Sequence, residues 1–174
     1  MLIRTACARD FEALSRLAAE TYAAAFGDSF SPADLAAHLE HHLSPQNFAR
    51  YLDEDTILVA EMEARMIGFA QFGVSTLSPR PISAGDRDLR RLYVLSGYQN
   101  QGIGSALMAA ALEHPDMQRA ERIYLDVWEH NPGAQRFYAR HGFETIGAHA
   151  FSVESGAETG LDCIMVHRRR RPGA

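Results

Sequence analysis

The residues with the clearest potential for chemistry in this chain are the glycines that follow a short β-type stretch. That stretch, Leu89–Leu95, is rich in branched and aromatic residues, and residues 105–112 are strong helix formers. Between them lies the turn Gln99-Asn-Gln-Gly102-Ile-Gly104. A glycine-rich turn that opens a helix leaves several backbone N–H groups unpaired around one point, where a phosphate can bind. The spacing therefore predicts a phosphate-binding turn, and a turn without a ligand is the alternative for so short a pattern.

Two familiar phosphate-binding patterns do not fit these glycines. Gly97 and Gly102 have the spacing of a Walker A loop, but Ile103 and Gly104 stand where that loop needs lysine and serine or threonine. A dinucleotide-binding fingerprint fails because its third glycine is a leucine here. The pattern that fits is Gln/Arg-x-x-Gly-x-Gly/Ala, which begins at Gln99. It resembles the pyrophosphate loop of the GNAT superfamily of acetyl-CoA-dependent N-acetyltransferases.

A second block of residues supports the same resemblance. It consists of Asn131-x-x-Ala134-x-x-Phe137-Tyr138-x-x-x-Gly142-Phe143, and it follows the first block in the order and at the separation found in that family. The two blocks together are far more specific than either one alone. The chain is therefore identified as a member of the GNAT superfamily.

Hydrophobic periodicity and turn residues predict the elements that must position the two blocks. Strands are expected at Leu2–Ala6, Thr56–Met62, Met66–Val74, Leu89–Leu95, Arg122–Trp128, Phe143–Val153 and Leu161–His167. Helices are expected at Asp10–Phe26, Pro32–Leu43 with Ser31 as its N-cap, Pro45–Tyr51, Ser105–Leu112 and Ala134–His141, with a loop at Ser75–Asp86 and a turn at Glu154–Gly160.

The resemblance implies how these elements assemble. It implies an α/β (α+β) fold with a central mixed, mostly antiparallel sheet of about six to seven strands, flanked by helices. Two central strands of that sheet are expected to splay apart. We expect a single domain over residues 1–174, with 168–174 as a basic tail.

Length and charge narrow the class of protein. The 174 residues suffice for one sizeable core, and the net charge is −5. Without the four arginines at 168–171, 13 basic residues face 22 acidic ones, which gives −9. An acidic body argues against nucleic acid as a partner and suits a cationic substrate. With no membrane-spanning run and no secretion signal, we expect a cytoplasmic protein whose Cys7 and Cys163 are buried thiols.

The resemblance implies acetyl-CoA as cosubstrate. Main-chain groups of the central strand would pair with the pantetheine arm, and a β-bulge there would aim an N–H group at the thioester carbonyl. The N–H groups from 101 to 106 would hold the pyrophosphate. The implied cofactor site consists of Leu92, Tyr93, Val94, Gln99, Asn100, Gln101, Gly102, Ile103, Gly104, Ser105, Ala106 and Asn131. Asn131 has two compatible roles, as a helix N-cap and as a contact of the CoA arm.

Tyr138 is the candidate catalytic residue. When an amine attacks a thioester, the departing thiolate needs a proton, and a phenol can donate one. The family match implies this role of general acid. The alternative is an aromatic residue that packs beside Phe137 in the core.

The general base does not carry over from the resemblance. Many relatives have a glutamate two residues before the Leu-Tyr-Val triplet of the central strand, and this chain has Arg90 there. Glu61, Asp126 and Glu129 are the substitutes, acting directly or through water. A structural or solvated role is the alternative for each of them.

The predicted substrate is a primary amine of a small molecule. The stretches 20–27, 92–94, 127–131 and 147–151 resemble the bacterial spermidine/spermine N-acetyltransferases, which makes a polyamine the leading acceptor. Arg90 departs from that pattern. It argues against a polyamine as the acceptor, because a cation near the site would repel one. The alternatives are acetylation of protein or peptide amines and a module that binds CoA without catalysis. If the protein assembles with copies of itself, we expect a homodimer.

No metal site is predicted from the sequence. The two cysteines lack metal-ligand spacing. His38, His41 and His42 match no zinc motif, and we interpret them as a solvated helix face.

Overall fold

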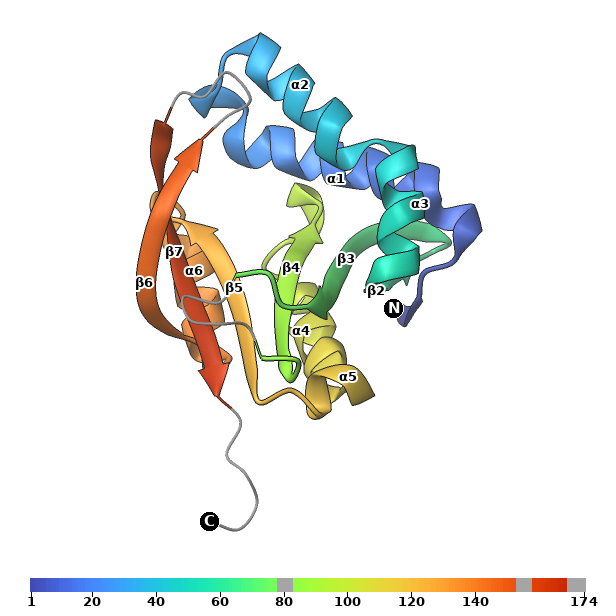
Figure 1. Cartoon of the computed structure of the whole chain (residues 1–174). Helices are drawn as coiled ribbons and strands as arrows, with labels where there is room; N and C mark the ends of the chain where they lie inside the picture. The colour runs from blue at the N-terminus through green and yellow to red at the C-terminus, as the bar shows by residue number, and fades with distance from the viewer. Residues whose placement is uncertain (78–82, 153–157, 169–174) are drawn as a thin grey trace, which may run out of the picture.

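A seven-stranded sheet forms the centre of the computed structural model, which describes residues 1–77, 83–152 and 158–168 (Figure 1). The strand order is β1-β2-β3-β4-β5-β7-β6, and only β4 and β5 are parallel. The strands are β1 (Leu2–Thr5), β2 (Thr56–Met62), β3 (Arg65–Val74), β4 (Asp86–Val94), β5 (Arg122–Trp128), β6 (Glu144–Ser152) and β7 (Glu158–Arg168). The helices are α1 (Phe11–Phe26), α2 (Pro32–Leu43), α3 (Pro45–Glu54), α4 (Ile103–Glu113), α5 (Pro115–Gln118) and α6 (Pro132–Arg140). The expected mixed, mostly antiparallel α/β fold is confirmed.

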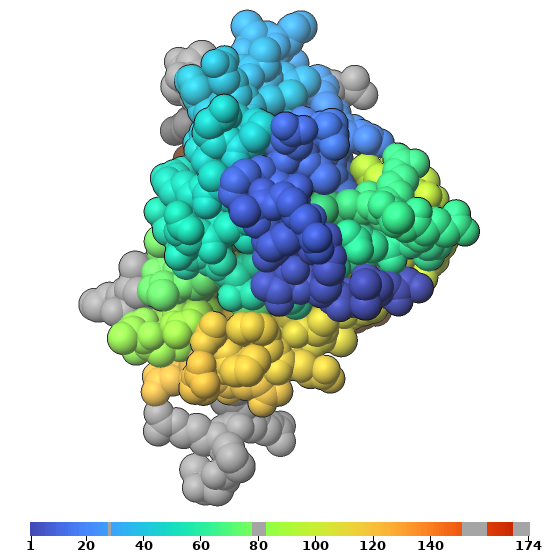
Figure 2. Space-filling view, turned by 90° about the vertical axis from the view of Figure 1, so that its right-hand side faces the viewer, coloured from blue at the N-terminus to red at the C-terminus, as the bar shows by residue number. Residues whose placement is uncertain are grey.

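The middle of the sheet is buried on both faces. Because side chains alternate along a strand, neighbouring residues of β2 pack on opposite faces. Ile57 and Val59 pack with residues of α1, α2 and α3, whereas Leu58 and Ala60 pack with residues of α4 and α5. In Figure 2 the blue N-terminal segments lie beside the cyan residues of α2 and α3 on one side of the molecule. None of the described helices has the length and hydropathy needed to cross a membrane.

The helix starts differ in a way that matters for binding. Ser31 and Ser44 cap α2 and α3, accepting hydrogen bonds from the amides of Asp34 (3.1 Å) and Asn47 (3.4 Å). Serine is a favoured cap because its oxygen satisfies an amide that the helix cannot. At α4 the capping residue is Gly102, which has no side chain to do this. The first amides of α4 are therefore left for another partner.

The central strands β4 and β5 pair only where they begin. Residues 86–88 face 122–124 in parallel register, and the pairing ends there. A buried ion pair lies at this closed end: Arg122 donates from Nε (2.9 Å) and Nη2 (3.0 Å) to the Asp86 carboxylate, which is 0% exposed. The predicted splay of the central strands is thus confirmed, and Figure 1 shows β4 and β5 diverging toward α1.

Several sequence-based boundaries differ from the structure. The predicted loop to Asp86 is too long, because β4 begins at Asp86 and not at Leu89. β7 begins at Glu158 rather than Leu161. Cys7 is exposed and Cys163 is partly buried, so the prediction of two buried thiols is wrong. Most of the predicted turn Glu154–Gly160, and all of the predicted tail beyond residue 168, lie outside the described residues.

We expect Arg122→Gln to lower the free energy of unfolding by about 3 kcal/mol, because it leaves the buried Asp86 carboxylate without its cation. Urea denaturation at neutral pH measures this change. The control is Arg119→Gln, which removes an exposed partner of Asp116 and should cost at most about 1 kcal/mol. Equal losses from the two variants would contradict the proposed importance of the Asp86–Arg122 pair.

Candidate functional site

A cleft of about 930 Å³ opens where β4 and β5 separate. Its walls come from α1, α2, the second half of β4, the start of α4, the end of β5 and α6, so both sequence blocks meet there. The predicted residues that line it are Leu92, Tyr93, Val94, Gln99, Asn100, Gly102, Gly104, Ser105, Asn131 and Tyr138. The predicted residues Gln101, Ile103 and Ala106 lie outside this lining.

The turn that precedes α4 is held by its own side chains. Gln99 donates from Nε2 to the Val94 carbonyl (3.0 Å), and Gln101 donates likewise to the Gly97 carbonyl (3.1 Å). Gly102 has φ = 82°, in the left-handed region that favours glycine. These contacts fix the shape of the turn before any ligand arrives.

Four amides at the start of α4 point out of the helix without intrahelical partners. Ala106 is the first residue of this helix to donate along it, to the Gly102 carbonyl (2.9 Å). The amides of 102–105 are thus the ones that can receive an anion, and the Ala106 amide is already in use. The Ile103 side chain is buried in the core, so only its backbone can take part.

The edge of β4 that faces β5 is unpaired beyond Asp88. Residues 92–94 pair with β3 on one side, and their other side borders the cleft. The pairing with β3 skips Arg90, whose two neighbours face consecutive residues of β3. This skip is a β-bulge, at the strand in which the resemblance implied one.

The positive charge of Arg90 is neutralised by its neighbours. Its guanidinium donates to Asp55 Oδ2 (2.9 Å), the Val74 carbonyl (2.7 Å) and Thr76 Oγ1 (3.1 Å), and it lies 3.4 Å from Asp88 Oδ2. Two carboxylates therefore share one cation. The expected repulsion between Arg90 and a cationic substrate is correspondingly weakened.

Tyr138 lines the cleft and also packs in the core. Its ring lies 5.4 Å from that of Phe137 and 6.0 Å from that of Phe143. Burial raises the pKa of the phenol above its usual value, and the nearby Tyr93 and Asp126 act in the same direction. The phenol therefore stays protonated at neutral pH and can act as a donor. The core position and the catalytic role predicted for Tyr138 are compatible.

Asn131 begins α6 as an N-cap. Its Oδ1 accepts a hydrogen bond from the Ala134 amide (3.0 Å), so the predicted capping role is confirmed. The same residue lines the cleft. A contact with the CoA arm stays a prediction.

Aromatic side chains form the wall of the cleft nearest α1. The ring of Phe26 lies 4.6 Å from that of Tyr22 and 5.5 Å from that of Trp128. Phe30 stacks 6.2 Å from Phe26. This wall can contact an apolar chain or a cation.

His38 belongs to this wall as well. Its ring stacks on Tyr22 at 4.2 Å, and it lines the cleft. The expectation of a solvated histidine face is wrong for His38, because the face of α2 that carries His38 packs against α1. It is right for the exposed His41 and His42.

Only one of the three candidate bases lies in the cleft. Glu61 is ion-paired with Arg4 at 2.5 Å, away from the cleft lining. Glu129 accepts a hydrogen bond from the Leu161 amide (2.8 Å), which ties it to β7. Asp126 lines the cleft and faces it from β5. Among these three carboxylates, the geometry therefore favours Asp126 as the candidate general base.

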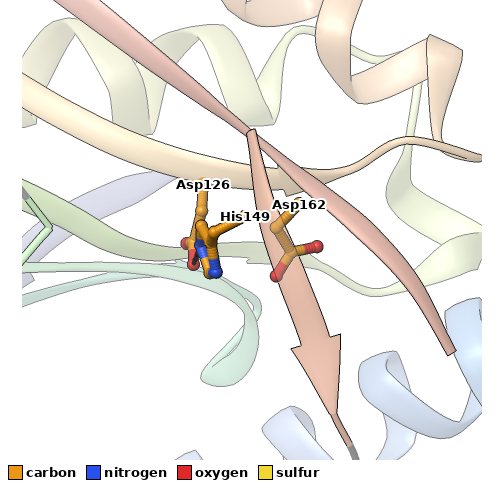
Figure 3. A group of neighbouring side chains, drawn as sticks. All are labelled: Asp126, His149 and Asp162. Atoms are coloured by element: carbon orange, nitrogen blue, oxygen red, sulfur yellow. Dashed lines mark ion pairs between the residues drawn. The ribbon is translucent and has the colours of Figure 1, made fainter. Parts of the chain in front are cut away.

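Asp126 is part of a cluster with His149 and Asp162. The three side chains come from β5, β6 and β7, and Figure 3 shows their polar ends on the same side of the sheet. His149 Nε2 lies 3.6 Å from Asp126 Oδ2, and ligand atoms of all three residues lie within 4.8 Å of one another. Burial, with the neighbouring Asp126, raises the pKa of Asp162 to about 6. No metal site was predicted from the sequence, and an acidic group of this kind among the described residues is common without an ion.

Sequence reasoning missed Asp162. One signal was present: a single acidic residue interrupts the apolar run from Leu161 to Val166. A charge in such a run is rarely buried without a partner. The partners, however, come from β5 and β6, and their proximity depends on the strand order.

Comparison with known proteins assigns these features to a family. Residues 11–143 match the family model "Acetyltransferase (GNAT) family". An uncharacterised N-acetyltransferase of Mycobacterium tuberculosis is 34% identical over 161 residues, which cover 90% of this chain and 96% of the relative. The spermine/spermidine N(1)-acetyltransferase of Bacillus subtilis is 28% identical over 133 residues, which cover 68% of this chain and 87% of that enzyme.

Solved structures share the fold. A PaiA N-acetyltransferase from Thermoplasma acidophilum, in complex with coenzyme A, has a TM-score of 0.75 at 20% identity, with 97% of this chain and 98% of that chain covered. The ribosomal-protein-S18-alanine N-acetyltransferase of Escherichia coli has a TM-score of 0.72 at 19% identity, covering 99% and 96%. At these identities the two structures support the fold alone.

We expect Asp162→Asn to stabilise the protein by about 2 kcal/mol at pH 8 and to have little effect at about pH 3 or below. The pKa of Asp162 is raised from 3.8 to about 6 in the folded state, so its ionised form opposes folding, and that cost builds up between these two pH values and is complete above them. Thermal unfolding across this pH range measures the difference. Asp53→Asn, at an exposed position on α3, is the control, and a loss of stability by Asp162→Asn at pH 8 would contradict the account.

Proposed function

The chain belongs to the GNAT family of acetyltransferases, and from this premise we propose that it acetylates a primary amine of a small molecule, with a polyamine as the leading acceptor. Acetyl transfer and acetyl-CoA as cosubstrate follow from the family. The acceptor and the residue roles are the proposal. The observation that carries it is a single cleft that joins free helix amides to an aromatic wall and two carboxylates, Asp126 and Asp162.

Coenzyme A is proposed to enter from the α4 side of the cleft. The amides of 102–105 hold the diphosphate, since they lack intrahelical partners and lie at the positive end of the helix dipole. The pantetheine arm then runs along 92–94, where the edge of β4 offers unpaired main-chain groups. Asn131, across the cleft, contacts the arm from α6.

The chemistry is proposed to be direct attack in a ternary complex. The amine attacks the thioester carbonyl, and an N–H group near the Arg90 bulge stabilises the oxyanion of the tetrahedral intermediate. Tyr138 gives its proton to the departing thiolate and regains one from the nitrogen of the intermediate. No covalent enzyme intermediate is needed.

Three observations support an amine of polyamine type. The chain has a net charge of −5, which attracts cations at long range. The aromatic wall of Tyr22, Phe26 and Trp128 can pack against the methylenes between two nitrogens. The similar Bacillus subtilis protein is described as a spermine/spermidine N(1)-acetyltransferase.

Incubation with acetyl-CoA and a panel of monoamines, polyamines and short peptides, with release of free thiol as readout, tests the function. We expect turnover with polyamines, and we expect Tyr138→Phe to lower kcat by about 100-fold because the thiolate loses its proton donor. Tyr51→Phe, which removes a hydroxyl bonded to the His42 carbonyl on the α2–α3 side, should keep the parent rate. Turnover of peptides alone would contradict the acceptor class, and no turnover with any amine would contradict the function.

The glycine turn is tested by calorimetric titration with coenzyme A. We expect Gly102→Ala to weaken binding about tenfold, because alanine costs about 1–2 kcal/mol in the left-handed conformation and so favours a rearranged turn. Gly97→Ala is the matched control, since an added Cβ meets no atom within 4 Å at either glycine but only Gly102 has a positive φ. Equal affinities for the two variants would show that the shape of the turn does not matter for binding.

A further inference from the structure

The cluster of Asp126, His149 and Asp162 is built by strand register. His149 of β6 faces Asp162 of β7, and Asp162 faces Trp128 of β5, two residues beyond Asp126. Side chains two residues apart on a strand lie on the same face, so register alone brings the three groups together. The cluster lies beside the aromatic wall, because Trp128 of the wall faces Asp162 in the strand register.

Asp162 differs from the other buried carboxylates. Asp86 is bonded to Arg122, and Asp88 accepts hydrogen bonds from Ser75 and Thr76. Asp162 is only 9% exposed, lines the cleft and receives no hydrogen bond from any described residue. A mostly buried carboxylate that lacks a donor among the described residues is costly, so this one is placed to receive a donor from a ligand in the cleft.

We propose that Asp126 and Asp162 bind the ammonium group of the acceptor, and that Asp162 takes its proton before the amine attacks the thioester. The inference rests on the proposed amine acetyltransferase function and deepens it. It assigns the general base to a residue of β7 that no sequence motif indicates.

The position of the cluster fits this role. Asp126 lines the same cleft as Tyr93 and Tyr138, where the thiolate is proposed to depart. Asp162 is next to Asp126 and also feels the charge of Glu129. Two carboxylates that face one opening bind a cation and compete for one proton. Such a pair can hold an ammonium group and then accept a proton from it.

The proton balance closes with groups of this chain. The ammonium nitrogen loses one proton to Asp162 and becomes nucleophilic. After attack, the nitrogen loses a second proton, which reaches the sulfur through Tyr138, so that the products are the amide and the free thiol. The proton on Asp162 passes to His149 and then to solvent, and the carboxylate is ready for the next ammonium.

His149 is suited to pass the proton on. Its side chain is 41% exposed, so it contacts solvent as well as the cluster. Its Nδ1 lies 3.2 Å from the Ala150 carbonyl, and its Nε2 faces Asp126. Both ring nitrogens thus face oxygen atoms, so the ring connects the carboxylate cluster to its solvent-exposed side.

Two acceptors compare a substrate that must lose a proton with one that need not, and the split between kcat and KM separates proton acceptance from binding. The first is the best polyamine of the panel, which is protonated at pH 7, and the second is trifluoroethylamine, whose nitrogen is already neutral there. We expect Asp162→Asn to lower kcat at saturating polyamine by about 100-fold and to have little effect on kcat with trifluoroethylamine. Asp53→Asn is the control with the same change of charge, and it should match the parent with both acceptors.

The remaining outcomes are equally decisive. Equal losses of Asp162→Asn with both acceptors, or no loss with either, would overturn the assignment of the base while leaving acetyl transfer intact. Calorimetry must show unchanged affinity for coenzyme A, which excludes a folding defect as the cause of a loss. Asp126→Asn should mainly raise KM for the polyamine. Loss of the parent rate in EDTA and its return with Zn²⁺ would replace the ammonium site by a metal site, and a parent inactive with every amine would instead overturn the proposed function.

Discussion

The interrupted pairing of β4 with β5 is the constraint on which the rest of this molecule depends. The two strands share three residue pairs at one end, where the buried Asp86 carboxylate is held by Arg122. Beyond that point each strand keeps its outer neighbour, β3 or β7, and loses the inner one. The sheet is therefore continuous where β4 and β5 begin. Beyond that point the two strands leave an opening that can admit a ligand.

This opening brings the groups that we propose to act together into one cleft. The edge of β4 has unpaired main-chain groups because β5 has moved away, and the glycine turn at the end of β4 opens toward the same space. Asp126 and Trp128 project from the diverging end of β5. Arg90 lies at the bulge, and its ion pairs with Asp55 and Asp88 keep its charge from dominating the cleft. A thioester placed along β4 would thus meet an amine held on β5 and β7.

Much of this could be predicted from the sequence, since the local signals were strong. The glycine turn, the Asn131 cap and nearly every helix and strand were predicted from spacing and residue type. The first residues of β4 were missed because Asp86, Arg87 and Asp88 are poor strand formers, and they become acceptable only through partners distant in sequence, such as Arg122. Asp162 was missed for the same reason: its neighbours are set by the order of β5, β7 and β6, which no local pattern encodes.

The most direct test of this account is a crystal structure of the protein with coenzyme A bound. The account predicts a diphosphate against the amides of 102–105, a pantetheine arm along 92–94 between β4 and β5, and a sulfur atom within hydrogen-bonding reach of the Tyr138 phenol. A coenzyme bound outside the opening between β4 and β5, or a sulfur atom remote from Tyr138, would contradict it.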